Sequence, residues 1–417
     1  MSEVLDKKDD GLKIVDSRPV RPDGADKVTG RAAYGADLTM PGQLVGKILR
    51  SPHAHARIVS IDTRKARAAP GVKAVITGAD LPDVASEMHD GGEAASNLRD
   101  LALNVMARDK ALYEGHAVAA VAASSAAAAD AALALINVTY EVLPHVIEVE
   151  DAMRPDAPVL HPAMRTGGLE APGTEPTNIA KRNRIGRGDP NAAFGEAEVV
   201  VERRYTTKPV HQGYIEPHAC VASWAEDGQC EVWASSQGQF MVRTYCAKVL
   251  GVDISSIRVI PAEIGGGFGG KTTVYLEPLA LALSRQAGHP VKMVMTRDEV
   301  FRATGPTSGS VMTVKLGAKR DGTIIAADVE LKFQAGAFPG SPVGGGSMTA
   351  LACYDIPNFQ ITGWDVVTNT PKVAAYRAPG APISAFAVES AVDELARELG
   401  MDPIDLRLKN APRNGSK

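Results

Sequence analysis

Cysteine is scarce in this sequence, with four residues among 417. Cys220, Cys230, Cys246 and Cys353 form neither a C-x-x-C pair nor a Cys/His spacing typical of zinc sites. We therefore expect neither an iron–sulfur cluster bound by this chain nor a framework of structural disulfides. Cys220 and Cys230 flank a predicted hairpin and are close enough in sequence to pair, but buried free thiols are the expected state in a cytosolic protein.

Long apolar runs and an excess of one charge are missing too. The first ten residues are polar and contain no apolar segment of a secretory signal. The Ala-rich stretch 117–138 has the length of a membrane span, but interrupting polar residues favour a soluble strand–helix unit. The net charge of −4 argues against nucleic acid or an anionic membrane as the main partner. We expect a soluble cytoplasmic protein of two or more domains.

Glycine, by contrast, is concentrated in the segment GGGFGGKT at residues 265–272. A strand-like sequence precedes it at 257–260, and helix-type apolar spacing follows at 275–284, with Pro278 in the first turn. Glycine lets the main chain approach a ligand closely and lets successive N–H groups point the same way. The pattern predicts a loop that holds an anionic or oxo-rich group by its main chain.

The same segment also satisfies the phosphate-loop pattern G-x-x-x-x-G-K-[ST]. In that alternative the protein is a P-loop nucleotide binder using Gly265–Thr272, with Lys271 on the β/γ-phosphates and Thr272 on magnesium. A metal-orienting carboxylate should then follow a buried strand, and Asp298 is only a loose match. The glycine motif alone leaves this alternative open.

Composition and periodicity divide the chain into four segments. We expect an N-terminal arm over 1–25, a compact α+β unit of short strands over 26–150, a Pro- and Gly-rich linker over 151–190, and a second unit over 191–417. Within the second unit, residues 342–346 are predicted to form another glycine-rich loop.

Three loops of the second unit each follow a predicted strand. They contain Gln237, the segment Gly265–Lys271, and Arg377. A neutral amide donor, a nest of main-chain N–H groups and a guanidinium are suited to converge on one oxo-rich anionic group. A P-loop enzyme has no need of the first and third loops.

The order of S-S-Q at 235–237, G-G-G-F-G-G-K at 265–271 and A-Y-R-A-P-G at 375–380 resembles the molybdenum-binding large subunit of the xanthine oxidase and aldehyde oxidase family of molybdenum hydroxylases. Glu216-Pro217-His218 and the motif at 24–37 also have counterparts in that family. The resemblance covers nearly the whole chain from about residue 20. It implies an α+β fold in which an α/β hammerhead domain is followed by the first part of the molybdopterin-binding region.

The resemblance also implies a cofactor, molybdenum–molybdopterin cytosine dinucleotide. By analogy, Gln237 would donate its side-chain amide to a molybdenum oxo ligand, Phe268 would place main chain against the metal centre, and Arg377 would close the opposite side. The resemblance thus implies that Gln237, Phe268 and Arg377 contact the molybdenum centre by main chain or as neighbours of its own ligands. The other residues implied for cofactor binding are Gly238, Gly267, Gly269 and Ala378, and those implied for the substrate pocket are Gly345 and Pro379.

The implied reaction is hydroxylation of an electron-poor carbon with water as the oxygen source. Electrons would leave through 2Fe-2S and FAD groups on partner subunits, in a dimer of heteromers. The family's catalytic Glu, in a G-x-G-E-type motif, has no match before Lys417, so no catalytic residue is expected in this chain and it should not turn over alone. Two alternatives follow: a natural split subunit similar to that of nicotinate dehydrogenase, with the Glu on a second half, or a truncated sequence.

The family's substrate-specific residues are largely absent. Purine-hydroxylating relatives carry Glu where this chain has Thr272, Arg near Gly345, and Phe where it has Pro379, which disfavours xanthine. Carbon-monoxide-oxidising relatives need Cys where this chain has Ala378. The resemblance leaves an N-heteroaromatic compound or an aldehyde as substrate, and the gap expected at Gly345 would admit a larger ring.

Overall fold

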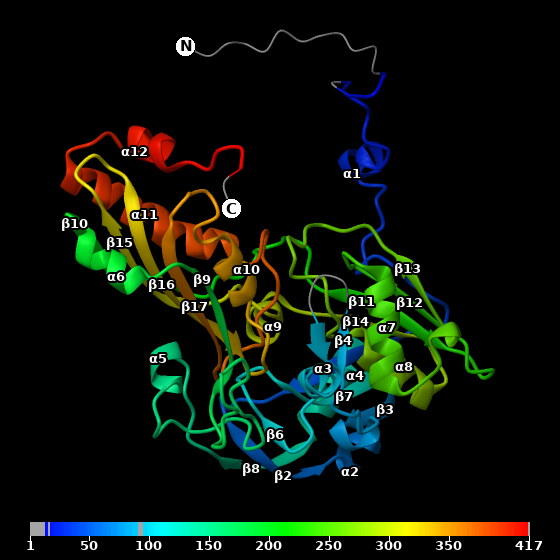
Figure 1. The fold of residues 1–417 in the computed structure, drawn as a ribbon. Coiled ribbons are helices and arrows are strands. Elements are labelled where there is room, and N and C mark those ends of the chain that lie inside the picture. Colours follow the sequence, from blue (N-terminus) through cyan, green and yellow to red (C-terminus); the bar gives the residue numbers. More distant parts are fainter. Residues whose placement is uncertain (1–12, 16, 91–94, 416–417) are drawn as a thin grey trace.

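The computed structural model describes residues 13–15, 17–90 and 95–415. Its helices and strands gather around two large sheets that lie side by side (Figure 1). This mixed α+β architecture confirms the predicted fold class.

The larger sheet draws strands from both expected units. Its order is β13-β12-β11-β14-β1-β7-β3. The strands are β1 (Leu44–Arg50), β3 (Val72–Thr77), β7 (Ala117–Ala123), β11 (Ala219–Trp224), β12 (Cys230–Ala234), β13 (Ile257–Pro261) and β14 (Val291–Val294). Because β1 pairs with β14, the sheet is continuous across the predicted domain boundary. The Ala-rich stretch supplies β7, which is buried along its full length between β1 and β3.

The second large sheet has the order β10-β15-β16-β17-β9. Its strands are β9 (Ile179–Arg187), β10 (Val199–Thr207), β15 (Ser310–Ala318), β16 (Ile324–Gly336) and β17 (Asn358–Val367). Apolar residues of β15 and β16 alternate toward a core that α10 (Val343–Thr349) and α11 (Ala381–Leu399) cover. The opposite face is polar and carries a hollow of about 470 Å³ that no residue of the three loops lines.

Smaller elements complete the fold. A three-stranded sheet has the order β6-β2-β8, formed by β2 (Ala56–Asp62), β6 (Lys110–Ala111) and β8 (Asn137–Val142), and β4 (Met88–Asp90) pairs with β5 (Ala95–Asn97). The remaining α-helices are α1 (Gly24–Thr29), α2 (Arg64–Arg67), α3 (Leu98–Val105), α4 (Ala126–Leu133), α5 (Val149–Ala152), α6 (Pro190–Glu196), α7 (Gln239–Leu250), α8 (Glu277–Ala287), α9 (Arg297–Ala303) and α12 (Pro403–Asn410). Every helix within the described residues is too short or too polar to cross a bilayer.

Two sequence expectations need correction. The predicted linker over 151–190 contains β9, which pairs with β17 as the edge strand of the second large sheet. The predicted glycine-rich loop at 342–346 runs into helix α10. A Cβ on Gly346 would lie 3.2 Å from the Phe333 ring, so the missing side chain lets this helix pack closely on the sheet.

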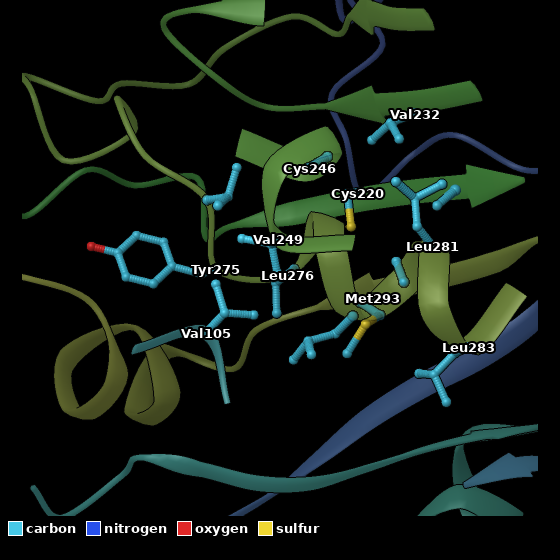
Figure 2. Packing of buried hydrophobic residues seen from close by; sticks show 14 of the residues in the cluster. Val105, Cys220, Val232, Cys246, Val249, Tyr275, Leu276, Leu281, Leu283 and Met293 are labelled. Carbon is cyan, nitrogen blue, oxygen red and sulfur yellow. The ribbon is translucent and has the colours of Figure 1, made fainter. Parts of the chain in front are cut away.

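The core beneath the glycine-rich segment is formed by α7, α8 and the larger sheet. Figure 2 shows Cys220 of β11, Cys246 of α7 and Leu281 of α8 packed together, and all three are fully buried. The cysteines are free thiols, as expected, and burial raises the pKa of the Cys220 and Cys246 thiols well above the usual value. This packing supports β12 and β13, which lead into the first two loops of the candidate site.

Candidate functional site

The first loop connects β12 to α7 and presents Gln237. The side-chain oxygen of Gln237 accepts hydrogen bonds from the main-chain N–H of Gly269 (2.8 Å) and of Lys271 (3.2 Å). Two N–H donors require an oxygen at this position, which fixes the orientation of the amide. Its NH₂ group therefore points away from these donors, and it has no acceptor in the described part of the protein.

The second loop is the glycine-rich segment between β13 and α8, and its backbone needs glycine at defined points. Gly266 and Gly269 have φ angles of 97° and 102°. A Cβ on Gly267 would lie 2.4 Å from the Gln237 side-chain oxygen, and one on Gly269 would lie 2.5 Å from the Ala375 carbonyl oxygen. Neighbouring loops thus approach closer than any side chain would allow.

The third loop follows β17 and leads into α11. The N–H of Arg377 donates to the carbonyl of Phe268 at 2.9 Å, which joins this loop to the glycine-rich one. Phe268 and Ala378 are non-glycine residues with φ of 51° and 59°. Strained backbone of this kind gathers at ligand sites, where surrounding contacts enforce it. The Arg377 side chain is exposed, and its guanidinium contacts no partner among the described residues.

The three loops therefore meet, as predicted, and they leave donors free. Among the described residues, the main-chain N–H groups of Gly266, Gly267 and Phe268 have no acceptor within the protein. The helices α7 and α11 begin in the first and third loops, so their N-termini add positive potential nearby. These donors and the Gln237 amide suit an oxo-rich anionic group, and the main chain of Arg377 reaches the same loop.

The described residues around the three loops offer no set of side chains that could ligate a metal. Within the described ranges, no group of three or more His, Cys, Asp or Glu is placed to hold a metal ion. The carboxylates next to the loops are already engaged: Glu216 pairs with Lys271 at 2.7 Å, and Glu263 pairs with Lys27 at 2.7 Å. The site is therefore a set of hydrogen-bond donors on loops that lie too close together for a side chain at Gly267 or Gly269. It fits a cofactor that brings its own metal ligands.

The P-loop alternative does not fit this geometry. The Lys271 side chain has no exposed surface and points into an ion pair with Glu216, away from any phosphate position. The Thr272 hydroxyl donates to the Gly269 carbonyl at 2.8 Å, so it is occupied within the loop. Helix α8 begins only at Glu277, whereas a P-loop opens directly into its helix.

The residues expected to form the substrate pocket lie together beside the third loop. A Cβ on Gly345 would lie 2.8 Å from the Pro379 carbonyl oxygen. The expected gap at Gly345 is therefore filled by the main chain of Pro379, and the glycine instead brings α10 against the loop. Gly238 is the residue before α7 and its N–H donates to the Ser236 hydroxyl at 3.1 Å.

Sequence reasoning missed the residues that support the loops from behind. The Gln212 amide donates to the carbonyls of Gly305 (3.1 Å) and Ala375 (2.8 Å), and a Cβ on Gly270 would lie 2.9 Å from it. Gln212 lies four residues before Glu216 in a segment of no regular secondary structure, so no periodic pattern marks it. Lys27, part of the N-terminal motif, donates to the Ile264 carbonyl at 3.2 Å, which brings that motif against the glycine-rich loop.

A neutral hydrogen-bonded network lies below the loop. The Tyr214 hydroxyl and the Nε2 atom of His218 are 2.7 Å apart, and the hydroxyl also lies 3.3 Å from that of Thr304. Burial lowers the pKa of His218 well below its usual value, and the nearby Lys271 ammonium acts in the same direction. Burial raises the pKa of Tyr214 to about 12. Both groups are therefore uncharged near neutral pH.

Comparison with known proteins identifies the family of the chain. Residues 172–411 match the family described as the molybdopterin cofactor-binding domain, and residues 29–144 match the a/b hammerhead domain of aldehyde oxidase and xanthine dehydrogenase. The chain is 33% identical over 405 residues to the xanthine dehydrogenase molybdenum-binding subunit of Escherichia coli O157:H7, covering 95% of this chain and 52% of that protein.

Two further relatives are covered by this chain to very different extents. The chain is 32% identical over 408 residues to the nicotinate dehydrogenase large molybdopterin subunit of Eubacterium barkeri, covering 97% of this chain and 91% of that protein. The solved structure of aldehyde oxidoreductase from Desulfovibrio gigas superposes with a TM-score of 0.84 at 30% identity, over 95% of this chain and 43% of that one. The chain thus spans about half the length of several relatives and nearly all of one. It belongs to the molybdenum hydroxylase family of the xanthine dehydrogenase and aldehyde oxidoreductase type, with a hammerhead domain followed by a molybdopterin cofactor-binding domain.

Proposed function

We propose that this chain is the molybdopterin-binding part of a molybdenum hydroxylase that hydroxylates an electron-poor carbon of an N-heteroaromatic compound or an aldehyde. The observation that carries the proposal is the meeting of the three loops. The Gln237 side chain bonds the main chain of Gly269, and the main chain of Arg377 bonds that of Phe268, so loops more than a hundred residues apart surround one set of unpartnered donors. The bound cofactor would supply the redox chemistry and activate water.

The chain's own groups then have separable tasks. The free NH₂ of Gln237 donates to an oxo group, and the N–H groups of Gly266, Gly267 and Phe268 bind neighbouring acceptors through main chain alone. Gly269 lets the main chain of Ala375 approach, and Gly238 and Ala378 belong to the first and third of the loops that bind the cofactor. Because Arg377 carries a fixed positive charge, it stabilises negative charge on the far side of the same group.

The general base is proposed to come from another polypeptide segment. Glu216 and Glu263 are both held in ion pairs. Large apolar residues next to the loops are also exposed, among them Phe240 (84%), Ile215 (89%) and Met348 (73%). Uncovered apolar side chains around a site are typical of a surface that another chain covers. We propose that this covering segment is a second half of the molybdenum subunit, which carries the Glu.

The wider assembly follows from the same proposal. Partner subunits carry 2Fe-2S and FAD groups, the cofactor is the cytosine dinucleotide form, and the complex is a cytoplasmic dimer of heteromers. The relative named nicotinate dehydrogenase favours the N-heteroaromatic substrate class. Whether this chain is a natural split subunit or a truncated sequence is tested by the partner with which it copurifies.

The experiment is purification of the chain with its genomic neighbours, followed by molybdenum and iron analysis and identification of the nucleotide released by acid. We expect molybdenum close to one per chain, cytidine monophosphate, and turnover of nicotinate-like heterocycles or aldehydes over purines. The isolated chain should show no turnover. Magnesium-dependent ATP binding without molybdenum, or full activity of the isolated chain, contradicts the proposal.

A further inference from the structure

A buried ion pair joins the two ends of the glycine-rich loop. The ammonium of Lys271 lies 2.7 Å from Oε2 of Glu216, with 0% and 7% of the two side chains exposed. The same oxygen accepts a hydrogen bond from the N–H of Gly265 at 2.7 Å. One carboxylate oxygen therefore holds the first and the last residue of the loop at a fixed separation.

The main chain of Lys271 holds the first loop as well. Its carbonyl accepts from the N–H of Gln237 at 2.9 Å and from the Ser236 hydroxyl at 3.2 Å, while its N–H donates to the Gln237 side chain. Lys271 is thus the point at which the Gln237 loop, the glycine-rich loop and the Glu216 segment are joined. Moving Lys271 would displace the Gln237 amide and the free N–H groups of the glycine-rich loop together.

Stability alone does not explain an ion pair in this position. Removing two charges from water is costly, and apolar residues of similar volume are often as stabilising as a buried pair. Burial lowers the pKa of Lys271, which shows the direction of that penalty. The second oxygen of Glu216 is buried with no hydrogen-bond partner among the described residues, so the pair is not even fully satisfied.

We propose that Glu216 and Lys271 are positioning residues for the cofactor loop. The pair sets the distance between Gly265 and Lys271, so that the free N–H groups of Gly266, Gly267 and Phe268 converge on one acceptor group. This inference rests on the proposed function for the identity of that group. The restraint on the loop itself does not depend on it.

The test compares single and double variants of the pair in the copurified complex and in the isolated chain. Lys271→Met and Glu216→Met each leave one buried charge unpaired, and the double variant removes both charges at similar volume. The matched control is the pair Arg50–Glu299, at 2.9 Å and less buried, changed to Met in the same way. The measurements are thermal unfolding, molybdenum per chain, and hydrogen exchange at the amides of Gly265, Gly269 and Lys271.

We expect the single variants to unfold at lower temperature and the double variant to recover most of the loss. The double variant should still exchange the three loop amides about tenfold faster or more, because Gly265 loses its acceptor and the Gln237 oxygen that accepts from Gly269 and Lys271 is no longer held in place. Its molybdenum content should fall by a similar factor, and the control pair should leave both values unchanged. A double variant with wild-type exchange and wild-type molybdenum overturns the inference, because the pair then contributes only stability.

Two further outcomes stay interpretable. If the wild-type complex contains no molybdenum but the loop amides respond as expected, the proposed function fails and the restraint on the loop is supported. If the double variant does not fold, Glu216→Gln replaces it, because the amide oxygen still accepts from Gly265 while the charge pairing is lost. Faster exchange at Lys271 with unchanged exchange at Gly265 supports the inference, and unchanged exchange at both overturns it.

Discussion

Two substitutions of Gln237 separate its support of the loop from its contact with the cofactor. The side-chain oxygen accepts from Gly269 at 2.8 Å and from Lys271 at 3.2 Å, and the NH₂ group is free of any partner among the described residues. Gln237→Glu keeps an acceptor oxygen on a side chain of the same shape, and its negative charge strengthens both hydrogen bonds. It replaces the free donor with a negative oxygen. Gln237→Ala removes the acceptor oxygen, so the main-chain N–H groups of Gly269 and Lys271 lose their partner.

The magnitudes differ between the two variants. Gln237→Ala loses two neutral hydrogen bonds at an exposed position, which we expect to lower the free energy of unfolding by about 1–2 kcal/mol. Gln237→Glu should leave that free energy unchanged or slightly higher. It should nevertheless weaken cofactor retention by about 2 kcal/mol or more, since a hydrogen bond to a charged group is lost, and this corresponds to roughly 30-fold.

The assay is urea unfolding of the cofactor-free chain alongside molybdenum content of the copurified complex during dialysis. The decisive result is the contrast: stability falls in Gln237→Ala, whereas retention falls in both. If Gln237→Glu retains molybdenum as the wild type does, the amide donor does not contact the cofactor and the reasoning fails, even with unchanged stability.

Three further predictions use other parts of the structure. Gly269→Ala should lower the free energy of unfolding by about 1–3 kcal/mol more than the control Gly228→Ala. Both glycines have positive φ, but only at Gly269 would the added Cβ meet backbone, the Ala375 carbonyl oxygen at 2.5 Å. Equal losses in chemical denaturation would refute this. Arg377→Ala should change unfolding free energy by less than about 0.5 kcal/mol yet reduce molybdenum retention, since its guanidinium contacts no described partner; unchanged retention contradicts the assigned role. Burial lowers the pKa of His116 to about 4, whereas the pKa in the unfolded chain is about 6.5. Between these two pH values the unfolded chain binds more protons than the folded one. The folded state therefore loses up to about 3 kcal/mol of stability as the pH falls from 6.5 toward 4. His116→Gln should flatten this dependence in denaturation at pH 4.5 and 7.5, and an equal slope in both proteins argues against His116 as the cause.

The glycine-rich loop is the part of the site that the sequence predicts most directly. A need for close approach and positive φ at 265–270 leaves few residues other than glycine possible. Gln237 and Arg377 are predictable as loop residues after strands, and the structure brings them to the same place. The fold class can be predicted from the short alternating segments that mark strands. The pairing of β1 with β14 in one continuous sheet cannot be predicted, because pairing between strands far apart in the sequence leaves no local pattern.

The errors have a common physical origin. The Pro- and Gly-rich composition of 151–190 predicts a linker, yet residues 179–187 form an edge strand, a position that tolerates their charged side chains. The glycines of 344–346 indicate a loop, whereas helix α10 uses them to approach Phe333 and Pro379. In both cases the residue type is explained by a neighbour from elsewhere in the chain, and tertiary contact overrides local propensity.

Lys271 is the clearest example of this limit, because the direction of its side chain decides whether the loop could bind a phosphate. In the sequence, the lysine after the second pair of glycines fits a phosphate contact as well as any other role. Its direction is decided by Glu216, 55 residues earlier, whose carboxylate offers a buried partner at 2.7 Å. Once the ammonium points inward, the loop can offer only main-chain N–H groups on its outer face. The ion pair that rules out a P-loop is therefore also what leaves those donors available to a cofactor.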